Sequence, residues 1–146
     1  MGKMTTYITF VNDKAGKAEE AVKFYVSVFK NSKLDSLLHY KEGEYGGDKG
    51  MVKFAQFTLN GQEFFASENN EQHVWNASPA VSIFVECDSV EEIDELYEKL
   101  SEGGDLMLPL DDYGFSEKYA WFNDKYGTSW QLNVGKMNLA SEASEV

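Results

Sequence analysis

Residues 84–97 read FVECDSVEEIDELY, a stretch that joins the end of an apolar strand to the start of an amphipathic helix. Apolar side chains recur at helical spacing across residues 90–100. Ser89 and Glu92 form a capping box in front of them, and Gly103-Gly104 follows as a stop signal. The sequence therefore predicts a helix that begins after Ser89 and ends before the two glycines.

An upstream stretch has the same order of features. Residues 10–25 read FVNDKAGKAEEAVKFY, and their apolar positions predict a helix over about 16–29. Later in each half an aromatic strand precedes a glycine turn, at Phe54 to Phe57 with Gly61 and again at Tyr119 to Phe122 with Gly127. Amphipathic helices and aromatic hairpins can resemble each other by chance. Two such pairs in one order favour a duplicated chain.

Most of the remaining sequence predicts strands. Runs rich in β-branched, aromatic and aliphatic residues lie at 5–11, 34–41, 51–59, 62–67, 80–87, 117–122 and 128–134. Asn60-Gly61 is a two-residue hairpin signal, and residues 105–115 are interpreted as an edge strand followed by a loop. The predicted order is βαβββ followed by βαβββ, which is an α+β fold.

Composition excludes several classes of function. The chain has 146 residues, 42% of them hydrophobic, and a net charge of -12. All 13 basic residues are Lys, so no guanidinium group is available for phosphate or base recognition, and nucleic-acid binding is not expected. No apolar run is long enough to cross a membrane, and one cysteine, Cys87, suits a reducing compartment. We therefore expect a cytoplasmic protein without membrane or nucleic-acid partners.

Two motifs resemble a known family. The run AEEAVKFYVSVFKNS at residues 18–32 is similar to the opening of PhnB-like proteins. DKYG at 124–127, followed by Ser129-Trp130-Gln131 and preceded by Trp121, is similar to their closing hairpin. These proteins belong to the glyoxalase, bleomycin-resistance and dioxygenase superfamily, also called vicinal oxygen chelate. The resemblance covers residues 5–134.

The resemblance implies one domain, residues 1–135, made of two βαβββ modules at about 4–70 and 78–135. Their curved mixed sheets would form a cleft with the helices outside, and residues 136–146 would be a small acidic tail. Open edge strands in such sheets need covering, so we also expect a homodimer.

Metal-dependent members of the superfamily place four ligands on these strands. Carried over by position, the four become Thr6, Phe65 or Ala66, Ser82 or Ala80, and Gln131. Only Gln131 is a ligand type of the superfamily, whereas divalent ions need several imidazole, carboxylate or thiolate groups. No metal and no other cofactor is therefore predicted.

The histidines, the cysteine and two glutamates are interpreted as surface or core residues and not as catalytic groups. His39 and His73 lack a second metal-type ligand at useful spacing and are interpreted as surface residues. Cys87 falls on the helix-facing side of its strand, which favours a core role over a nucleophile. Glu63 and Glu86 would act as bases only if the cleft desolvated them.

Strand alternation suggests which side chains line the cleft. In the first strand it predicts Thr6, Ile8 and Phe10 facing inward, with Tyr7 and Thr9 facing a helix. In the last strand Gln131 faces inward and Trp130 faces a helix. The expected ligand contacts are Thr6, Phe57, Phe65, Ser82, Phe84, Trp121 and Gln131, with Trp75 as a further aromatic candidate. Aromatic residues also fill cores, so each ring has a core alternative.

The function expected from these features is binding of a small apolar or aromatic molecule in the cleft without a metal. The alternatives are a metal-dependent lyase or dioxygenase, or the demethylubiquinone methyltransferase with which the family is labelled. Methyltransferases of the Rossmann type have a glycine-rich turn after the first strand, whereas residues 12–16 read NDKAG. The glycine-rich segment 43–50 is a flexible loop or a lid, and it is not a P-loop.

Overall fold

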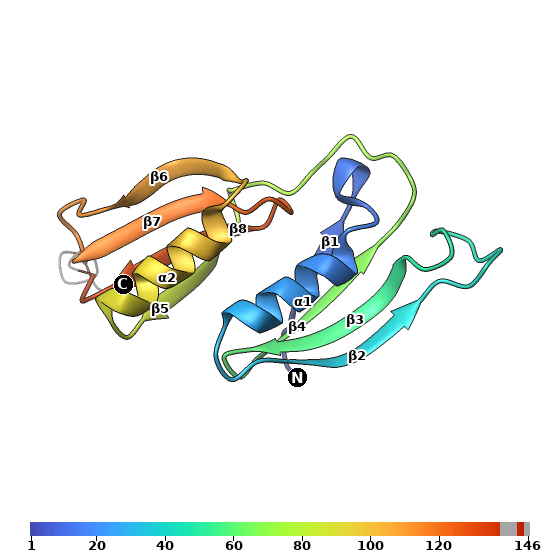
Figure 1. Ribbon diagram of the computed structural model, residues 1–146, viewed down its shortest axis with the longest axis horizontal. Helices are drawn as coiled ribbons and strands as arrows, with labels where there is room; N and C mark the ends of the chain where they lie inside the picture. The colour runs from blue at the N-terminus through green and yellow to red at the C-terminus, as the bar shows by residue number, and fades with distance from the viewer. Residues whose placement is uncertain (138–142, 145–146) are drawn as a thin grey trace. The chain divides into compact units, whose positions relative to one another are not determined.

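The computed structural model describes residues 1–137 and 143–144, so most of the predicted tail lies outside the described residues. The chain forms two compact units, Met1–Ala77 and Ser78–Val146. Each unit has its own four-stranded sheet and its own α-helix (Figure 1). In the described part of the chain, neither helix has the length and apolar character needed to span a bilayer.

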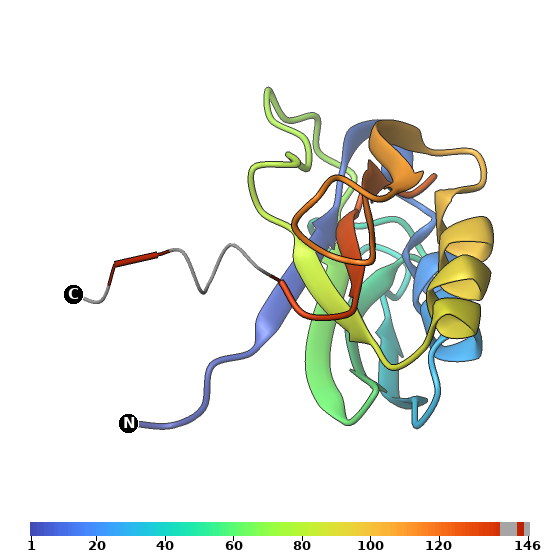
Figure 2. The same cartoon turned by 90° about the vertical axis from the view of Figure 1, so that its left-hand side faces the viewer.

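The first unit follows the predicted βαβββ order. Its elements are β1 (Thr6–Phe10), the short 3-10 helix η1 (Asn12–Lys14), α1 (Ala18–Val28), β2 (Lys33–His39), β3 (Val52–Leu59) and β4 (Gln62–Glu68). The strand order in the sheet is β1-β4-β3-β2, with β1 parallel to β4 and the other pairs antiparallel. The helix lies against one face of this sheet (Figure 2).

The second unit repeats this topology. Its elements are β5 (Ile83–Cys87), α2 (Val90–Ser101), β6 (Asp105–Asp111), β7 (Lys118–Asn123) and β8 (Ser129–Val134). The strand order is β5-β8-β7-β6, again with one parallel pair, β5 with β8. The α+β prediction and the doubled βαβββ order are confirmed, and β6 is the predicted edge strand.

Local signals determine α2 and the hairpins. The Ser89 hydroxyl accepts a hydrogen bond from the Glu92 N–H at 3.1 Å, as the capping box predicts. Asn60 and Gly61 have φ values of +49° and +79°, the left-handed pair that a tight hairpin requires. Strand β5 is shorter than the predicted 80–87, because residues 78–81 form a turn in which the Val81 N–H donates to Ser78 O.

Helix α1 begins without a local cap, because Lys17 at its N-cap makes no side-chain hydrogen bond there. The buried Glu68 carboxylate, at the end of β4, takes that role instead. Its Oε1 accepts from the N–H groups of Gly16 at 2.5 Å and Ala18 at 3.2 Å, and its Oε2 accepts from Val52 N–H at 2.6 Å. One carboxylate thus ties the helix start to two strands and places Glu68 on the helix side of the sheet.

This placement reverses the prediction for β1. In the parallel register Thr6 pairs with Phe64, and Phe10 pairs with Glu68 on the helix-covered face. Tyr7 pairs with Phe65, and their rings are in contact with centroids 6.1 Å apart. The predicted inward orientation of Thr6, Ile8 and Phe10 is therefore wrong, because their partners on β4 lie on the α1 side.

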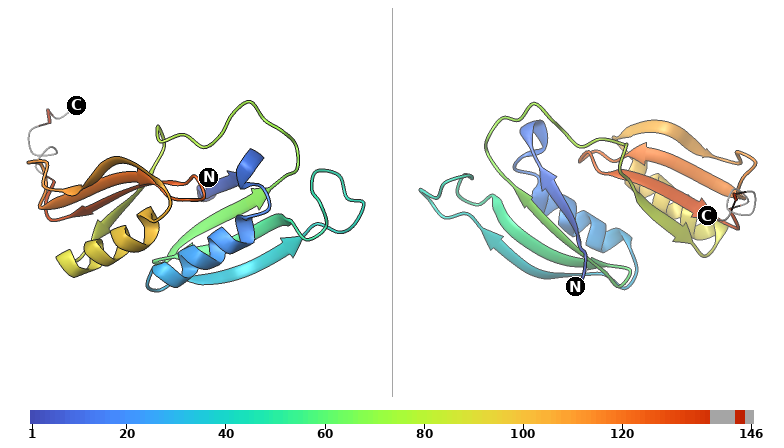
Figure 3. Two further views of the ribbon diagram at one scale, coloured as in Figure 1. Left: turned by 45° about the horizontal axis from the view of Figure 1, so that its top comes forward. Right: turned by 180° about the vertical axis from the view of Figure 1, so that it is seen from behind.

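The predicted orientation in the second unit is confirmed. Lys118 pairs with Asp94 of α2 at 2.8 Å, and the Phe122 ring contacts Tyr97 of α2, so both strand residues face the helix. Phe122 is paired with Trp130 in the antiparallel register. Seen from behind in Figure 3 (right panel), the strands of each sheet lie in front of their own helix. We call this side of each sheet its helix-free face.

Candidate ligand-binding site

The helix-free face of the second sheet has polar and aromatic side chains in cross-strand rows. The middle row consists of Phe84 on β5, Gln131 on β8 and Trp121 on β7. Paired residues on adjacent strands have Cβ atoms about 4.5–5.5 Å apart, so the Gln131 amide is flanked by two aromatic side chains. Phe84 is 40% exposed, and Trp121 and Gln131 are half-buried.

A hydroxyl pair lies beside this middle row. The Ser82 and Ser129 hydroxyls are 2.8 Å apart, and the Trp121 indole N–H donates to Ser129 Oγ at 3.2 Å. The indole is therefore held by a hydrogen bond at its edge, and its ring has a defined position. The sequence predicted Ser82 and Trp121 for the site but not the role of Ser129 between them.

Tyr119 lies on the other side of the middle row, in the row formed by Glu86, Asn133 and Tyr119. Its hydroxyl donates a hydrogen bond to Gln131 Oε1. Tyr119 is 5% exposed, and burial, followed by the proximity of Tyr113, raises the pKa of its phenol. The phenol therefore keeps its proton around neutral pH and acts as a donor.

An aromatic loop covers Tyr119. The Phe115 ring meets the Tyr119 ring edge-on with centroids 4.9 Å apart, and the Tyr113 ring does so at 6.1 Å. The Tyr113 hydroxyl donates to Pro109 O, so it has a partner away from Gln131. Tyr119 was not among the residues predicted from the sequence, although its position two residues before Trp121 in one predicted strand places both side chains on the same face.

The helix-free face of the first sheet has an aromatic cluster of its own. The Phe65 ring contacts Phe54 with centroids 5.0 Å apart, and Tyr7 contacts both rings. Beside them the Gln56 amide donates to the Glu63 carboxylate at 2.7 Å. Lys3 also pairs with Glu63, and the hydrogen bonds to Lys3 and Gln56 lower the pKa of that carboxyl, so it is a poor base.

Two predicted contacts lie elsewhere. Phe57 is fully buried on the helix-covered face, where it stacks on Phe64 with centroids 5.5 Å apart. Thr6 lies on that same face through its pairing with Phe64. Phe57 of β3 pairs with Phe64 of β4, and Phe65 is the next residue along β4. Because successive side chains on a strand alternate sides, Phe57 and Phe65 point to opposite faces of the sheet, and the prediction that both line one surface is wrong.

The four positions that the resemblance associates with a metal do not fit a divalent cation. Thr6 faces the helix side, the Ser82 hydroxyl is paired with Ser129, and Gln131 Oε1, the atom a metal would use, already accepts the Tyr119 hydrogen. Among residues 1–137 and 143–144, no group of three or more His, Cys, Asp or Glu side chains could hold a metal ion.

The remaining candidates have structural partners. His39 pairs with Glu19 at 2.5 Å on the surface of the first unit. His73 stacks on Trp75 with ring centroids 4.4 Å apart, which places Trp75 in the segment after β4. Cys87 is 8% exposed, and burial followed by the charges of Glu92 and Asp88 raises the pKa of its thiol to about 12. A thiol of this kind is a poor nucleophile.

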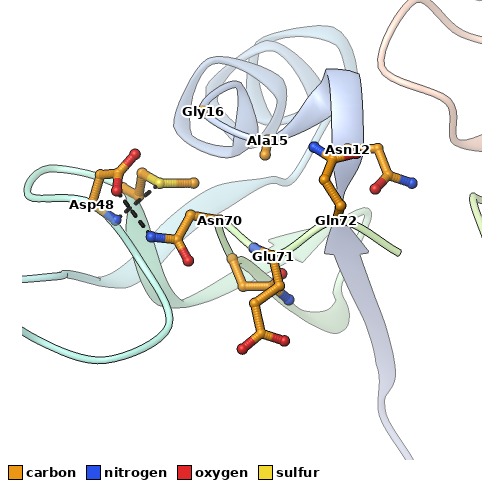
Figure 4. A pocket seen from close by; sticks show the side chains of 9 residues that line it. Asn12, Ala15, Gly16, Asp48, Asn70, Glu71 and Gln72 are labelled. Carbon is orange, nitrogen blue, oxygen red and sulfur yellow. Dashed lines mark hydrogen bonds between the residues drawn. The ribbon is translucent and has the colours of Figure 1, made fainter. Parts of the chain in front are cut away.

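A polar pocket of about 270 Å³ lies in the first unit, where the segment before α1 meets loop residues (Figure 4). Asp48 in its wall accepts from the Asn70 amide at 2.9 Å, and Asn70 N–H donates to Gly46 O at 3.0 Å. These bonds attach the 43–50 segment to the end of β4. The Gly16 and Ala18 N–H groups already donate to Glu68, so they are not available as donors to an anion bound in this pocket.

Comparisons with known proteins agree with this architecture. A family model described as 3-demethylubiquinone-9 3-methyltransferase matches residues 2–133. The solved structure of a PhnB protein from Bacillus cereus is 44% identical, with a TM-score of 0.85, and the match covers 92% of this chain and 100% of that one. No curated protein sequence matches the chain.

More distant structures share the fold alone. A glyoxalase/bleomycin resistance/dioxygenase domain from Frankia is 15% identical with a TM-score of 0.61, covering 93% of this chain and 98% of that chain. A mutant of the fosfomycin resistance protein FosX from Listeria monocytogenes, complexed with Mn(II) and 1S,2S-dihydroxypropylphosphonic acid, is 15% identical with a TM-score of 0.62, covering 97% and 99%.

Proposed function

Because the chain belongs to the PhnB-like family whose model is described as 3-demethylubiquinone-9 3-methyltransferase, with the glyoxalase/bleomycin resistance fold, we propose that it binds a small, flat, largely apolar or aromatic molecule without a metal. The observation that supports this most directly is the middle row Phe84, Gln131 and Trp121 on the helix-free face of the second sheet. Two rings beside one amide combine apolar area with one directional polar group, as small-molecule sites do.

The neighbouring contacts support the same site. Ser129 holds the Trp121 indole by its N–H, and Tyr119 holds the Gln131 amide by its oxygen. Side chains that are fixed before a ligand arrives lose little conformational freedom on binding. A flat ligand would stack on the Trp121 ring and lie over the Gln131 amide.

Titration with ethylbenzene, followed by heteronuclear NMR, tests this function. We expect saturable shifts at the Trp121 indole and around Gln131. Trp121→Ala should weaken binding about five-fold, on the order of 1 kcal/mol, because the aromatic face is lost. The matched control is Trp75→Ala, which removes a half-exposed indole from the other unit and should leave the affinity unchanged. Absence of saturable shifts, or an unchanged affinity in Trp121→Ala, would contradict the proposal.

The metal-free part of the proposal has its own test. Ligands that bind only the folded protein raise its melting temperature. Addition of Mn(II), Zn(II) or Ni(II) at a concentration well above that of the protein should leave the melting temperature unchanged, since Gln131 Oε1 is occupied and Thr6 faces the helix. A rise of several degrees that is lost in Gln131→Leu would favour the metal-dependent enzyme instead.

The methyltransferase description has no support in the geometry of the first strand. Strand β1 leads into the 3-10 helix Asn12–Lys14, and β1 lies at the edge of a sheet with a single parallel pair. Rossmann-type sites for dinucleotides and methyl donors need a parallel sheet with a glycine-rich turn. Methyl transfer is therefore not part of the proposed function.

We propose a homodimer as the assembly. The outer strands of the two sheets are β1, β2, β5 and β6. Pro109 in β6 has no N–H group to donate to a further strand, which disfavours pairing at that edge. Strand β1 has an exposed Tyr7 and no proline, so it is the better candidate for pairing with a second copy. Equilibrium sedimentation should give about twice the chain mass of 16.5 kDa, and a species of 16.5 kDa alone would contradict the dimer.

A further inference from the structure

We propose that Tyr119 fixes the Gln131 side-chain amide as a hydrogen-bond donor, so that the site selects flat ligands carrying a carbonyl-type oxygen. This inference rests on the proposed function and adds the polar group of the ligand. It makes Gln131 the residue that determines specificity and Tyr119 a positioning residue that acts through it.

The orientation of the Gln131 amide follows from what Tyr119 can offer. A phenol has a single hydrogen to donate, and the Tyr119 hydroxyl gives it to Gln131 Oε1. Tyr119 is a buried residue, so its hydroxyl hydrogen needs an acceptor within the protein. Within the described residues this hydrogen has no other acceptor, and turning the amide over would leave it unpaired.

Because Gln131 Oε1 accepts the Tyr119 hydrogen, the polar group that remains for a ligand is the Gln131 amide nitrogen. Within residues 1–137 and 143–144, Gln131 Nε2 has no hydrogen-bond partner. The Ser82 and Ser129 hydroxyls have other partners, because Ser129 Oγ accepts a hydrogen bond from Trp121 and is hydrogen-bonded to Ser82. Two N–H groups therefore remain available beside the rings of Phe84 and Trp121.

A ligand that covers these N–H groups without accepting a hydrogen bond from them binds less tightly, because the groups lose their water without gaining a partner. A ketone, aldehyde, quinone or amide oxygen next to an aromatic ring would accept one of them. A pure hydrocarbon of the same shape would gain the same apolar contact but lose this hydrogen bond. Acceptor-bearing flat molecules are thus favoured over hydrocarbons of equal size.

Acetophenone and ethylbenzene form the test pair, since they share the ring and the two-carbon arm and differ in the carbonyl oxygen. For the unmodified protein we expect acetophenone to bind about five-fold more tightly, a factor typical of one hydrogen bond. The side-chain amide signals of Gln131 should shift further with acetophenone than with ethylbenzene, because only the ketone accepts a hydrogen bond from them.

Tyr119→Phe removes the hydroxyl and keeps the ring. It frees the amide to turn over, so the ratio of the two affinities should fall by about two-fold, because only one of two orientations then presents the N–H groups, while ethylbenzene affinity is unchanged. A purely structural role for Tyr119 would weaken both probes together. Tyr113→Phe is the matched control, because its hydroxyl is bonded to Pro109 O, and it should keep the ratio of the unmodified protein.

Equal affinities in the unmodified protein, or an unchanged ratio in Tyr119→Phe, would overturn the inference and leave the proposed function standing. If neither probe binds, the proposed function falls together with it. Retained dispersion of the NMR spectrum shows that each variant is folded.

Discussion

The Asp124 carboxylate accepts the indole N–H of Trp130 at 2.8 Å, from six residues earlier in the chain. The other oxygen of the carboxylate accepts from the N–H groups of Tyr126 at 2.8 Å and Thr128 at 3.1 Å. Asp124 is 3% exposed and Trp130 is 1% exposed. The aspartate thus forms the turn and fixes the indole on the helix side of β8, which gives the closing-hairpin motif a structural role.

Asp124→Asn should lower the free energy of unfolding by about 2 kcal/mol, because the amide nitrogen cannot accept the Trp130 hydrogen. Urea denaturation measures this change. Asp105→Asn, at an exposed position at the start of β6, is the control and should stay within about 0.5 kcal/mol of the parent. Equal effects of the two substitutions would contradict the role of Asp124.

Glu68→Gln should destabilise the first unit by about 1–3 kcal/mol, since one amide oxygen cannot serve three N–H groups on two sides of a carboxylate. The Gly16 and Ala18 bonds reach Oε1 while the Val52 bond reaches Oε2. Hydrogen exchange should show the largest loss of protection at Val52 and the first turn of α1. Glu42→Gln at an exposed loop position is the control, and a comparable loss there would count against this role of Glu68.

Gly61→Ala should cost about 1 kcal/mol of stability, because Gly61 has a φ of +79° that a residue with a Cβ disfavours. The added Cβ would meet only the Asn31 amide at 3.4 Å, so the cost comes from the backbone and not from a clash. Gly2→Ala, with open space around it, should leave the thermal midpoint unchanged. A neutral Gly61→Ala would show that the turn relaxes without strain.

Cys87 should react with iodoacetamide very slowly at about pH 8 and rapidly once the protein is unfolded in urea. The reason is that burial raises the pKa of the folded thiol from 9.0 to about 12. As pH rises from about 9 to about 12, the unfolded thiol loses its proton while the folded thiol keeps it, so stability falls over that range. Cys87→Ala should remove this component of the pH dependence. Rapid labelling of the folded protein would contradict a buried thiol.

Local features of the sequence were enough to predict the face of the last strand, the start of α2 and one hairpin turn of the first unit. Strand β8 reads SWQLNV, a strict alternation of polar and apolar residues, and this pattern placed Gln131 opposite to the helix-facing Trp130. The Ser89 capping box and the Asn60-Gly61 turn each involve only a few consecutive residues. Residue type and spacing are therefore enough to predict them.

Strand β1 could not be oriented in this way. TYITF has apolar or β-branched residues on both sides, so its alternation is equally compatible with either face. Pairing with β4 decides the matter, because Glu68 must reach the start of α1 and brings Phe10 to that side. The same pairing turned Thr6 away from the helix-free face.

Element order and the face of the last strand depend on residues close along the chain, so they could be predicted from the amino-acid sequence, and the doubled order follows from the repeat of those elements. The cap of α1, supplied by Glu68, and the partner of Gln131, which is Tyr119 on the adjacent strand, arise from the folded structure alone. Both contacts join residues whose proximity arises from strand register. A buried polar group must be satisfied by whatever the folded chain brings near it, and no local pattern encodes that partner.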